Sequence, residues 1–384
     1  MTDTTVKYFD STMTGAPSLN GTAGSLIGVL DACLQDGFNS ITLDSLAIAD
    51  NVATATYSSG HGFTMQGTAG PVILIAGATP SGLNGEWRVT VTSTTQFTFA
   101  TSGISNQTAT GTITAKRAPL GWTKEFSDTN KAVYLPSILC VPCYLRVDDT
   151  IGQYAWGRGY ETVSDIDTGT GPFPTAAQLT NGVMYPKSTT GNSTSRPWWL
   201  IGDHGIIYFG LAWHATYPTY YDPMCFGDIN SLKSGDTYSS LITGSPNSNL
   251  PSYIGAENKF AEFGKYTEIQ AGKYLARSYT QLGSSVAAGM IGDACISNQI
   301  GRSGLEYPHP VDNGLLFAPI GVCHSSVVRS RAMPGIYQPL HSSFLPLTEI
   351  TDIPDIPGRI FAVVPLTNQG SETQAIFDLT GPWR

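Results

Sequence analysis

Hydrophobic and polar residues alternate along most of residues 45–116, and this period of two constrains the fold more than any other feature of the sequence. The clearest stretch is LNGEWRVTVTSTTQFTFATSG, from Leu83 to Gly103, which breaks at Thr94-Thr95 and then resumes. Successive side chains of a β-strand point to opposite faces of a sheet, so this pattern is typical of strands with one buried face. The stretch predicts a β-hairpin with a shared apolar set: Trp87, Val89, Val91, Phe97 and Phe99.

The rest of this block consists of similar short segments. NVATATYSSGHGF, GPVILIAGATPSG and ATGTITAKR are separated by turn residues and carry almost no charge. Several short strands with turn signals between them are typical of a small β-sandwich or barrel. We therefore expect residues 45–116 to be an inserted small all-β module. Residues 1–44, which include a helix, and residues 117–384 would form the main β-rich body.

Composition predicts a mainly β fold for the rest of the chain as well. Only 13% of the 384 residues are charged, and there are 42 glycines and 24 prolines, which favours turns and short strands over long helices. A hydrophobic share of 41% excludes a disordered chain. Strands are expected at Cys143–Asp149, in a hairpin within Pro197–Ala215, at Gly272–Thr280, Asn313–Val322 and Gly358–Leu366, and as a last edge strand within Ala375–Arg384.

One segment has helical spacing. In TAGSLIGVLDACLQDGF the apolar residues recur at intervals that place them on one side of a helix, with Ser25 able to cap the N-terminus and Gly37 the C-terminus. The sequence thus predicts one N-terminal amphipathic helix over residues 25–36, packed on a β-sandwich or barrel body. Its apolar face would consist of Leu26, Ile27, Leu30, Cys33 and Leu34.

The charge balance argues against nucleic acid as a partner. The chain carries 20 basic and 29 acidic residues, a net charge of −9, and no basic run longer than two residues. Such a field repels phosphate backbones and anionic membranes. The start, MTDTTVKYFDSTM, lacks the apolar segment of a signal peptide, and the apolar run Gly205–Trp213 is too short to span a bilayer. We expect a soluble protein made in the cytoplasm, without membrane insertion.

The cysteines do not form a recognisable redox or metal motif. Only the CVPC pair, Cys140 and Cys143, has a chemically meaningful spacing. A redox pair needs a helix N-terminus to lower the thiol pKa, whereas this stretch reads as extended chain, and a zinc site needs a second pair. We expect no metal or cofactor here. The six cysteines are Cys33, Cys140, Cys143, Cys225, Cys295 and Cys323.

The string DIDTGTG, from Asp165 to Gly171, is the most enzyme-like. It contains the Asp-Thr-Gly signature of aspartic proteases, but that chemistry needs two such aspartates sharing a proton, and no second triplet occurs. As a calcium loop it fails because Ala176 would stand where the bidentate carboxylate belongs. A polar turn is the better interpretation.

The histidines give no catalytic or metal-binding pattern. None of them has the i, i+4 spacing of a zinc helix, and in Cys323-His324-Ser325 adjacent strand residues would point to opposite faces. We therefore predict no catalytic, cofactor-binding or metal-binding residues, and a protein that is not an enzyme. The six histidines are His61, His204, His214, His309, His324 and His341.

Aromatic residues gather within Trp198–Tyr221. Rings at this density either line a sandwich core and a subunit interface, or stay exposed and stack on a host-surface glycan. We favour core and interface, and keep glycan binding as the alternative. The rings are Trp198, Trp199, Tyr208, Phe209, Trp213, Tyr217, Tyr220 and Tyr221.

Several strings resemble a group of tailed-bacteriophage virion proteins. The resemblance begins with KYFDSTMTGAPSLNGTAGSLIGVLDACLQDGFN and continues through residues 45–116 to GTITAKRAPLGWTKEFSDTNKAVY. It returns in YLRVDDT, GYETVSDIDTGTGPFPTAAQ, FGDINSLKSGDTY, YLARSYTQLGSSVAAG and PGIYQPLH, and so covers most of the chain. The block 45–116 is also similar to the Ig-like or small barrel modules inserted into many phage tail proteins. CVPC departs from the family pattern.

The resemblance implies a non-enzymatic structural component of the virion, of the tail or baseplate, assembled in the host cytoplasm. Its expected partners are copies of itself in a symmetric oligomer and other phage virion proteins. Three alternatives stay open: a receptor-binding tail protein that holds a host-surface glycan with the aromatic cluster or the small β module, a capsid decoration protein, and a glycan hydrolase, which would need a pair of carboxylates in a groove.

Overall fold

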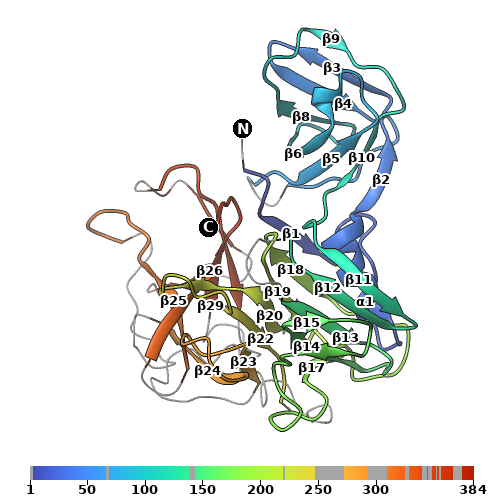
Figure 1. The fold of residues 1–384 in the computed structure, drawn as a ribbon. Coiled ribbons are helices and arrows are strands. Elements are labelled where there is room, and N and C mark those ends of the chain that lie inside the picture. Colours follow the sequence, from blue (N-terminus) through green and yellow to red (C-terminus); the bar gives the residue numbers. More distant parts are fainter. Residues whose placement is uncertain are drawn as a thin grey trace.

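The computed structural model describes residues 3–65, 69–137, 143–218, 221–246, 272–292, 309–324, 328–339, 344, 348–351, 353, 356–365 and 374–384. Within these residues the chain is mainly β, with several antiparallel sheets and one short α-helix, which confirms the predicted fold class. A small β lobe stands on a larger β body (Figure 1). Across the described ranges, no helix has both the length and the apolar character needed to cross a membrane.

The small lobe is a sandwich of two sheets with a hydrophobic core of its own. One sheet has the order β2 (Phe38–Thr42), β10 (Thr114–Arg117), β5 (Val72–Ala76) and β6 (Gly85–Arg88). The other has the order β7 (Thr90–Val91), β8 (Gln96–Ala100), β4 (Val52–Thr56), β3 (Ser45–Ala49) and β9 (Gln107–Thr108). A single 3-10 turn, η2 (Ser81–Leu83), precedes β6.

The predicted hairpin across Leu83–Gly103 is only partly present. Thr90-Val91 pairs with β8, but the preceding strand β6 pairs with β5 in the opposite sheet. The chain changes sheets at Val89, whose backbone N–H donates to the carbonyl of Pro71. The predicted packing of Trp87 on Phe99 is confirmed, with ring centroids 4.7 Å apart, but the contact joins two sheets rather than two arms of one hairpin.

The strands of this lobe run from Phe38 to Arg117, and they begin before the predicted start of the module at residue 45. Strand β2 belongs to the lobe because it pairs with β10, where Phe38 lies opposite Arg117. The two ends of the lobe are therefore cross-strand neighbours. We call residues 38–117 the module from here on. Whether it folds independently stays a prediction.

The body contains a five-stranded antiparallel sheet and a larger curled one. The smaller has the order β11 (Thr123–Asp128), β12 (Lys131–Leu135), β13 (Tyr144–Asp148), β14 (Tyr154–Tyr160) and β17 (Val183–Pro186), beside a ribbon of β15 (Thr162–Val163) and β16 (Gly169–Thr170). The larger begins with β1 (Lys7–Asp10), β18 (Trp198–Gly202), β19 (Ile206–Leu211), β20 (Asp222–Asp228), β22 (Ser240–Thr243), β23 (Lys273–Leu275) and β24 (Val286–Gly292). It continues with β25 (Phe317–His324), β26 (Val328–Pro339), β29 (Gln374–Asp378), β28 (Phe361–Pro365) and β27 (Glu349–Ile350), while β21 (Asn230–Ser231) pairs with β26.

The central strands of the larger sheet are buried on both faces. In β18, Trp198 and Leu200 join the core shared with the helix and the five-stranded sheet, whereas Trp199 and Ile201 join a second core. That second core also holds residues of β25, β26, β28 and β29, and the rings of Tyr208 and Phe377 lie 5.3 Å apart within it. The sheet thus curls so that its C-terminal strands cover β18 to β24. Burial on both faces explains the continuous apolar runs in these strands.

The hairpin predicted within Pro197–Ala215 is confirmed, because β18 and β19 pair across the turn at Asp203. The prediction of a last edge strand is wrong. Strand β29 pairs with β26 on one side and β28 on the other, so it lies inside the sheet. After forming β27 and β28 at the sheet edge, the chain returns and places β29 between β28 and β26. The alternation of residues within Ala375–Arg384 does not reveal this long-range pairing.

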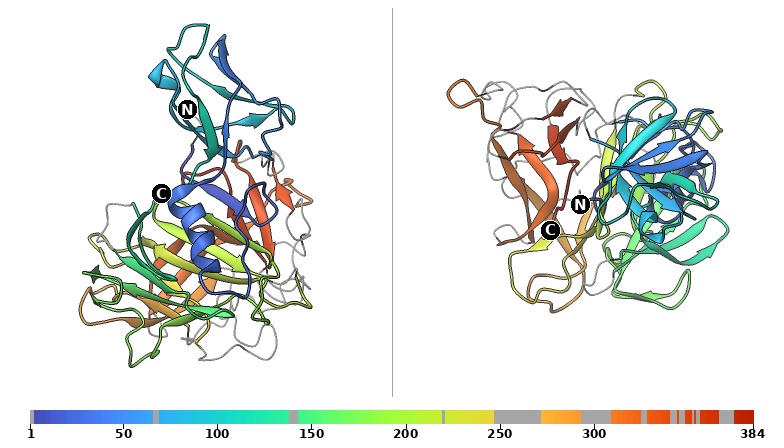
Figure 2. Two further views of the ribbon diagram at one scale, coloured as in Figure 1. Left: turned by 90° about the vertical axis from the view of Figure 1, so that its right-hand side faces the viewer. Right: turned by 90° about the horizontal axis from the view of Figure 1, so that it is seen from above.

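The helix forms where the sequence predicts it. Helix α1 (Ser25–Asp31) continues as the π-helical turn η1 (Ala32–Asp36), which ends at Gly37 with a φ of 70°. The predicted cap is wrong, since the Ser25 hydroxyl donates to the Asn20 carbonyl. Instead the Asp149 carboxylate accepts the first free backbone N–H groups of the helix. Figure 2 shows α1 on the outside of the body, below the module.

Candidate functional site

The aromatic cluster within Trp198–Tyr221 belongs mainly to the core. Two of its buried rings also use their polar atoms internally: the Trp198 indole N–H donates to the Pro17 carbonyl and the Trp213 indole N–H to Asp222. Tyr217 is exposed, Tyr221 is half-buried, and Tyr220 lies outside the described residues. Rings buried this deeply have no face open to a glycan. Each of the following is at most 2% exposed: Trp198, Trp199, Tyr208, Phe209 and Trp213.

The aspartate of the Asp-Thr-Gly triplet is an ion-paired loop residue. Asp167 accepts a hydrogen bond of 2.8 Å from Lys131 and a second, charge-assisted one from Arg146. These hydrogen bonds lower the pKa of Asp167 below its ordinary value. Asp165 in turn accepts the backbone N–H of Asp167. The string therefore builds the turn between β15 and β16, as the polar-turn interpretation predicts.

The described thiols are buried and unreactive. Burial raises the pKa of Cys143 and of Cys225 to about 12, and raises the pKa of Cys33 and Cys323 as well, so these groups stay protonated at neutral pH. Cys140 lies outside the described residues, together with Cys295, and so the CVPC pair as a unit is not described.

The described histidines lie apart from one another. His61 is buried in the module, where its Nδ1 accepts the Phe63 backbone N–H and its Nε2 lies 3.0 Å from the Ser93 carbonyl. His324 stacks on Tyr279 in the body, with ring centroids 4.9 Å apart. In the part of the chain that the structure describes, no three His, Cys, Asp or Glu residues are grouped so as to hold a metal ion. His341 lies outside that part.

Several buried or half-buried charged side chains lie at the junction of three parts of the chain: the N-terminal arm (residues 3–6), the module and the body. Lys7 of the edge strand β1 is 6% exposed, and its ammonium donates to the Pro119 carbonyl at 2.6 Å and to Glu86 of the module at 2.9 and 3.0 Å. Burial lowers the pKa of Lys7, while Glu86 acts in the opposite direction. The Lys7 ammonium therefore joins β1 of the body to Glu86 in the module and to Pro119 in the segment that follows the module.

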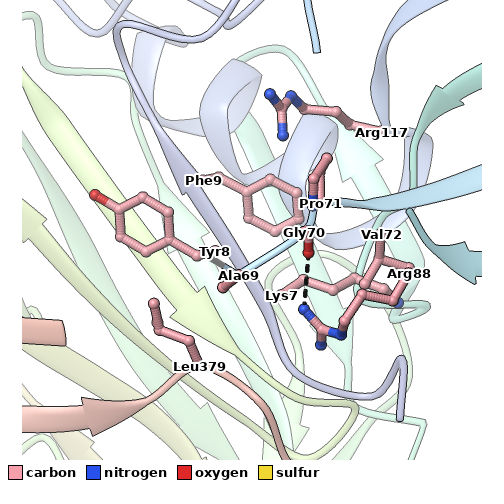
Figure 3. Close-up of a pocket in the computed structure, with 10 residues that line it drawn as sticks. All are labelled: Lys7, Tyr8, Phe9, Ala69, Gly70, Pro71, Val72, Arg88, Arg117 and Leu379. Carbon is pink, nitrogen blue, oxygen red and sulfur yellow. Dashed lines mark hydrogen bonds between the residues drawn. The ribbon is translucent and has the colours of Figure 1, made fainter. Parts of the chain in front are cut away.

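Arg88 makes a second tie at this junction. Its guanidinium donates to three backbone carbonyls at 2.8 to 2.9 Å, those of Asp3 and Val6 in the arm and of Gly70 in the module. Figure 3 shows Arg88 reaching Gly70, with Arg117 at the opposite end of the pocket. A planar guanidinium suits this role because its donors lie in fixed directions. The arm is thereby fastened to the module.

Arg117 ends the module and is almost fully buried. Its guanidinium donates to the Thr64 hydroxyl at 3.1 Å and lies 5.8 Å from the centre of the Phe63 ring. Burial lowers the pKa of Arg117 to about 10. Its Nε has no hydrogen-bond partner among the described residues. The adjoining cavity of about 20 Å3 has room for a single water, which could satisfy that group.

A larger cleft of about 220 Å3 adjoins the junction on the module side. It is lined by one residue of the arm, by three consecutive residues of β6, and by residues that follow β8. The lining residues include Thr4, Glu86, Trp87, Arg88, Thr101 and Ser102.

The junction was not predicted from the sequence, although the distribution of charged residues in the sequence gives one indication of it. Only Asp50, Glu86, Arg88 and Lys116 are charged within residues 45–116, and two of these four stand on the same face of one strand. Charges so placed in a nearly uncharged block mark a face that meets other polar groups. Their partners lie far away in the sequence, and alternation alone does not reveal them.

The body holds its own buried ion pairs. The Asp236 carboxylate accepts hydrogen bonds from Nε and Nη2 of Arg331 at 2.9 and 3.0 Å, and both side chains are fully buried. Arg277 makes a bidentate pair with Glu161 and packs over the Tyr238 ring. These pairs fix loops against the sheet and leave the carboxylates engaged by cations.

The chain matches no protein-family model, and no curated protein is significantly similar to it.

Proposed function

We propose that the chain is a non-enzymatic structural component of a tailed-bacteriophage virion, located in the tail or baseplate. It works by assembling with copies of itself and with other virion proteins. The sequence strings that resemble phage virion proteins support this proposal, and they run through the arm, the module and the body alike.

The observation that carries the proposal is the set of hydrogen bonds that joins the arm, the module and the body. A subunit of a large particle must hold its contact surfaces at fixed relative positions, because closed symmetric assemblies tolerate little error at each interface. Lys7 and Arg88 join arm, module and body through charge-assisted hydrogen bonds in a buried setting. Such bonds are stronger and more directional than those between neutral groups. The two lobes therefore suit a rigid part that presents the module away from the body.

The architecture of the body supports the same function. Strands β18 to β20 are buried on both faces, so two hydrophobic cores of the body lie on opposite sides of one sheet. Layered β-sheets packed in this way deform little, since packed cores have low compressibility. The expected surroundings of the chain are the assembled virion, after assembly in the host cytoplasm.

The test is the location of the chain in purified particles. Virions of the phage that encodes it are banded by density, analysed by quantitative mass spectrometry, and labelled for electron microscopy with antibody fragments against residues 38–117. The expected result is a fixed copy number per particle and label confined to the tail or baseplate. A replication protein of the same phage is the control for carry-over. Loss of the chain on banding contradicts the proposal, and label on the capsid contradicts the tail location.

A further inference from the structure

The cleft beside Trp87 has the composition of a ligand site. It lies where Thr4 of the arm approaches the module, along β6, which is the last strand in the order of its sheet. Its volume of about 220 Å3 is several times that of one water and below that of drug-sized sites. The cleft therefore has room for one small ring rather than for an extended chain.

The aromatic wall of the cleft is held in place before any ligand arrives. One side of the Trp87 ring stacks on Phe99 at 4.7 Å, and its indole N–H donates to the Leu83 carbonyl at 2.9 Å. Trp87 is half-buried, so part of its ring remains open. A ring that is already fixed loses little freedom on binding. It offers an apolar surface to the C–H groups of a saturated ring.

A fixed acceptor and a fixed donor stand beside this ring. Glu86 is held by Lys7, and Arg88 is held by three carbonyls, so neither side chain has to be ordered by the ligand. The carboxylate keeps free lone pairs, and the guanidinium keeps N–H groups beyond the three already in use. Hydroxyl groups both donate and accept, and they match such a pair. Because Lys7 already offsets the charge of Glu86, the Arg88 guanidinium leaves one positive charge beside the cleft.

The buried hydroxyl of Thr101 lacks a hydrogen-bond partner among the described residues, which is an independent indication of a ligand site. Thr101 is 7% exposed and lines the cleft, and its Oγ1 has no hydrogen-bond partner within the described ranges. A buried hydroxyl without a partner is destabilising. A ligand hydroxyl would complete this group if the side chain turned about χ1 to a staggered position that faces the cleft.

We propose that this cleft binds one sugar ring. The Trp87 ring packs against its C–H face, while Glu86, Arg88 and Thr101 bind its hydroxyl groups. The glycan-binding alternative raised by the aromatic residues thereby moves from the buried rings of the body to the module. The site stands on the geometry of the cleft, and it does not depend on where the chain resides in a particle.

The test uses the full chain labelled with 5-fluorotryptophan and observed by fluorine NMR. The chain has seven tryptophans, and Trp87→Phe identifies the resonance of Trp87. Methyl glycosides of glucose, mannose, galactose and N-acetylglucosamine are titrated to about 10 mM, which largely fills a site with a Kd of about 1 mM. We expect at least one of them to shift the Trp87 resonance saturably and to leave the other six in place. Methyl glucuronide, whose carboxylate can pair with Arg88, should bind at least as tightly as the neutral glycosides.

Matched variants separate binding from folding. Thr101→Val keeps the shape and removes the hydroxyl, and should weaken the glycoside about fivefold or more. Thr98→Val, on the outer face of β8, the strand that precedes Thr101, should bind as the unaltered chain does. Thr101→Ala also removes the hydroxyl and serves if Thr101→Val fails to fold. The proposal is overturned if no glycoside moves the Trp87 resonance, or if the folded cleft variants bind unchanged.

Discussion

Asp149 and Lys187 form a fully buried ion pair that also begins the only α-helix of the described residues. One carboxylate oxygen of Asp149 pairs with the Lys187 ammonium, and the other accepts the backbone N–H groups of Leu26 and Ile27 at 2.8 and 3.2 Å. Lys187 also donates to the Thr22 carbonyl. A strand end, a distant loop and the helix N-terminus are therefore held by one pair of charges.

Breaking this pair should destabilise the protein strongly. Asp149→Asn leaves the Lys187 ammonium buried without a countercharge, and we expect a loss of roughly 3–5 kcal/mol in the free energy of unfolding, measured by denaturant titration. Asp50→Asn, at an exposed turn, is the control and should change stability by less than about 0.5 kcal/mol.

The double variant Asp149→Asn/Lys187→Met sharpens this prediction. It removes both charges, so it should lower the free energy of unfolding by less than the sum of the two single changes. Each single variant leaves the other charge buried without a partner. Additive losses would show that the two residues stabilise the fold independently and would contradict the pairing.

Acid should weaken the contact that Asp167 makes with Lys131 and Arg146. These partners lower the folded-state pKa of Asp167, so its contribution is present above the unfolded pKa near 3.8 and is lost as the pH falls through the folded value. The contribution should be at most about 1 kcal/mol, because half the side chain is exposed and solvent screens the pair.

The measurement compares the unaltered chain with Asp167→Asn across the acid range. The stability difference between them should shrink as the pH falls below about 4. Carbon NMR of the Asp167 carboxyl should give a pKa that rises toward the ordinary value in Lys131→Met. A difference that is constant with pH would exclude this linkage.

Strand positions were largely accessible from the sequence, whereas their pairing was not. Alternation and turn residues located β8, β13, β18, β19 and β28 because a strand's side-chain period is local. They could not reveal that Val89 moves the chain into another sheet or that β29 lies inside its sheet, since both depend on partners far away in the chain.

The junction was hidden for the same reason. Lys7 meets Pro119, and Arg88 meets Asp3 and Val6, across long stretches of sequence. Isolated lysines and arginines are usually solvated surface residues, so their burial follows only from the tertiary fold. The capping of α1 by Asp149 rather than by Ser25 is another long-range contact of this kind.

Arg88 should control the attachment of the N-terminal arm. Arg88→Lys keeps the charge but cannot direct three fixed donors at three carbonyls. Backbone amides near residues 3–6 should then exchange with solvent about tenfold faster, a loss of about 1.4 kcal/mol in local stability. Hydrogen exchange followed by mass spectrometry measures this directly. Lys116→Arg, at a half-buried site on β10, is the control, and equal protection in both variants would show that Arg88 does not hold the arm.

The module should fold as an independent β-domain when residues 38–117 are expressed alone. Its core cluster is made of its own residues, and its ends, Phe38 and Arg117, are cross-strand partners. The remaining body, with a short Gly-Ser linker between Gly37 and Ala118, should also stay folded, because chain ends that lie close together can be joined without unthreading a core. Slowly exchanging amides in the fragment and a cooperative thermal transition in the body are the expected observations.

A shorter fragment, residues 45–116, tests which boundary is correct. It lacks β2, the partner of β10, together with the buried side chain of Leu43. Burial of one leucine contributes roughly 1.5–3 kcal/mol, so the shorter fragment should unfold at a clearly lower denaturant concentration than residues 38–117. Equal stability would place the boundary at residue 45 and make β2 part of the body. If neither fragment protects its amides from exchange, the module depends on the junction with Lys7 and Arg88 for its fold.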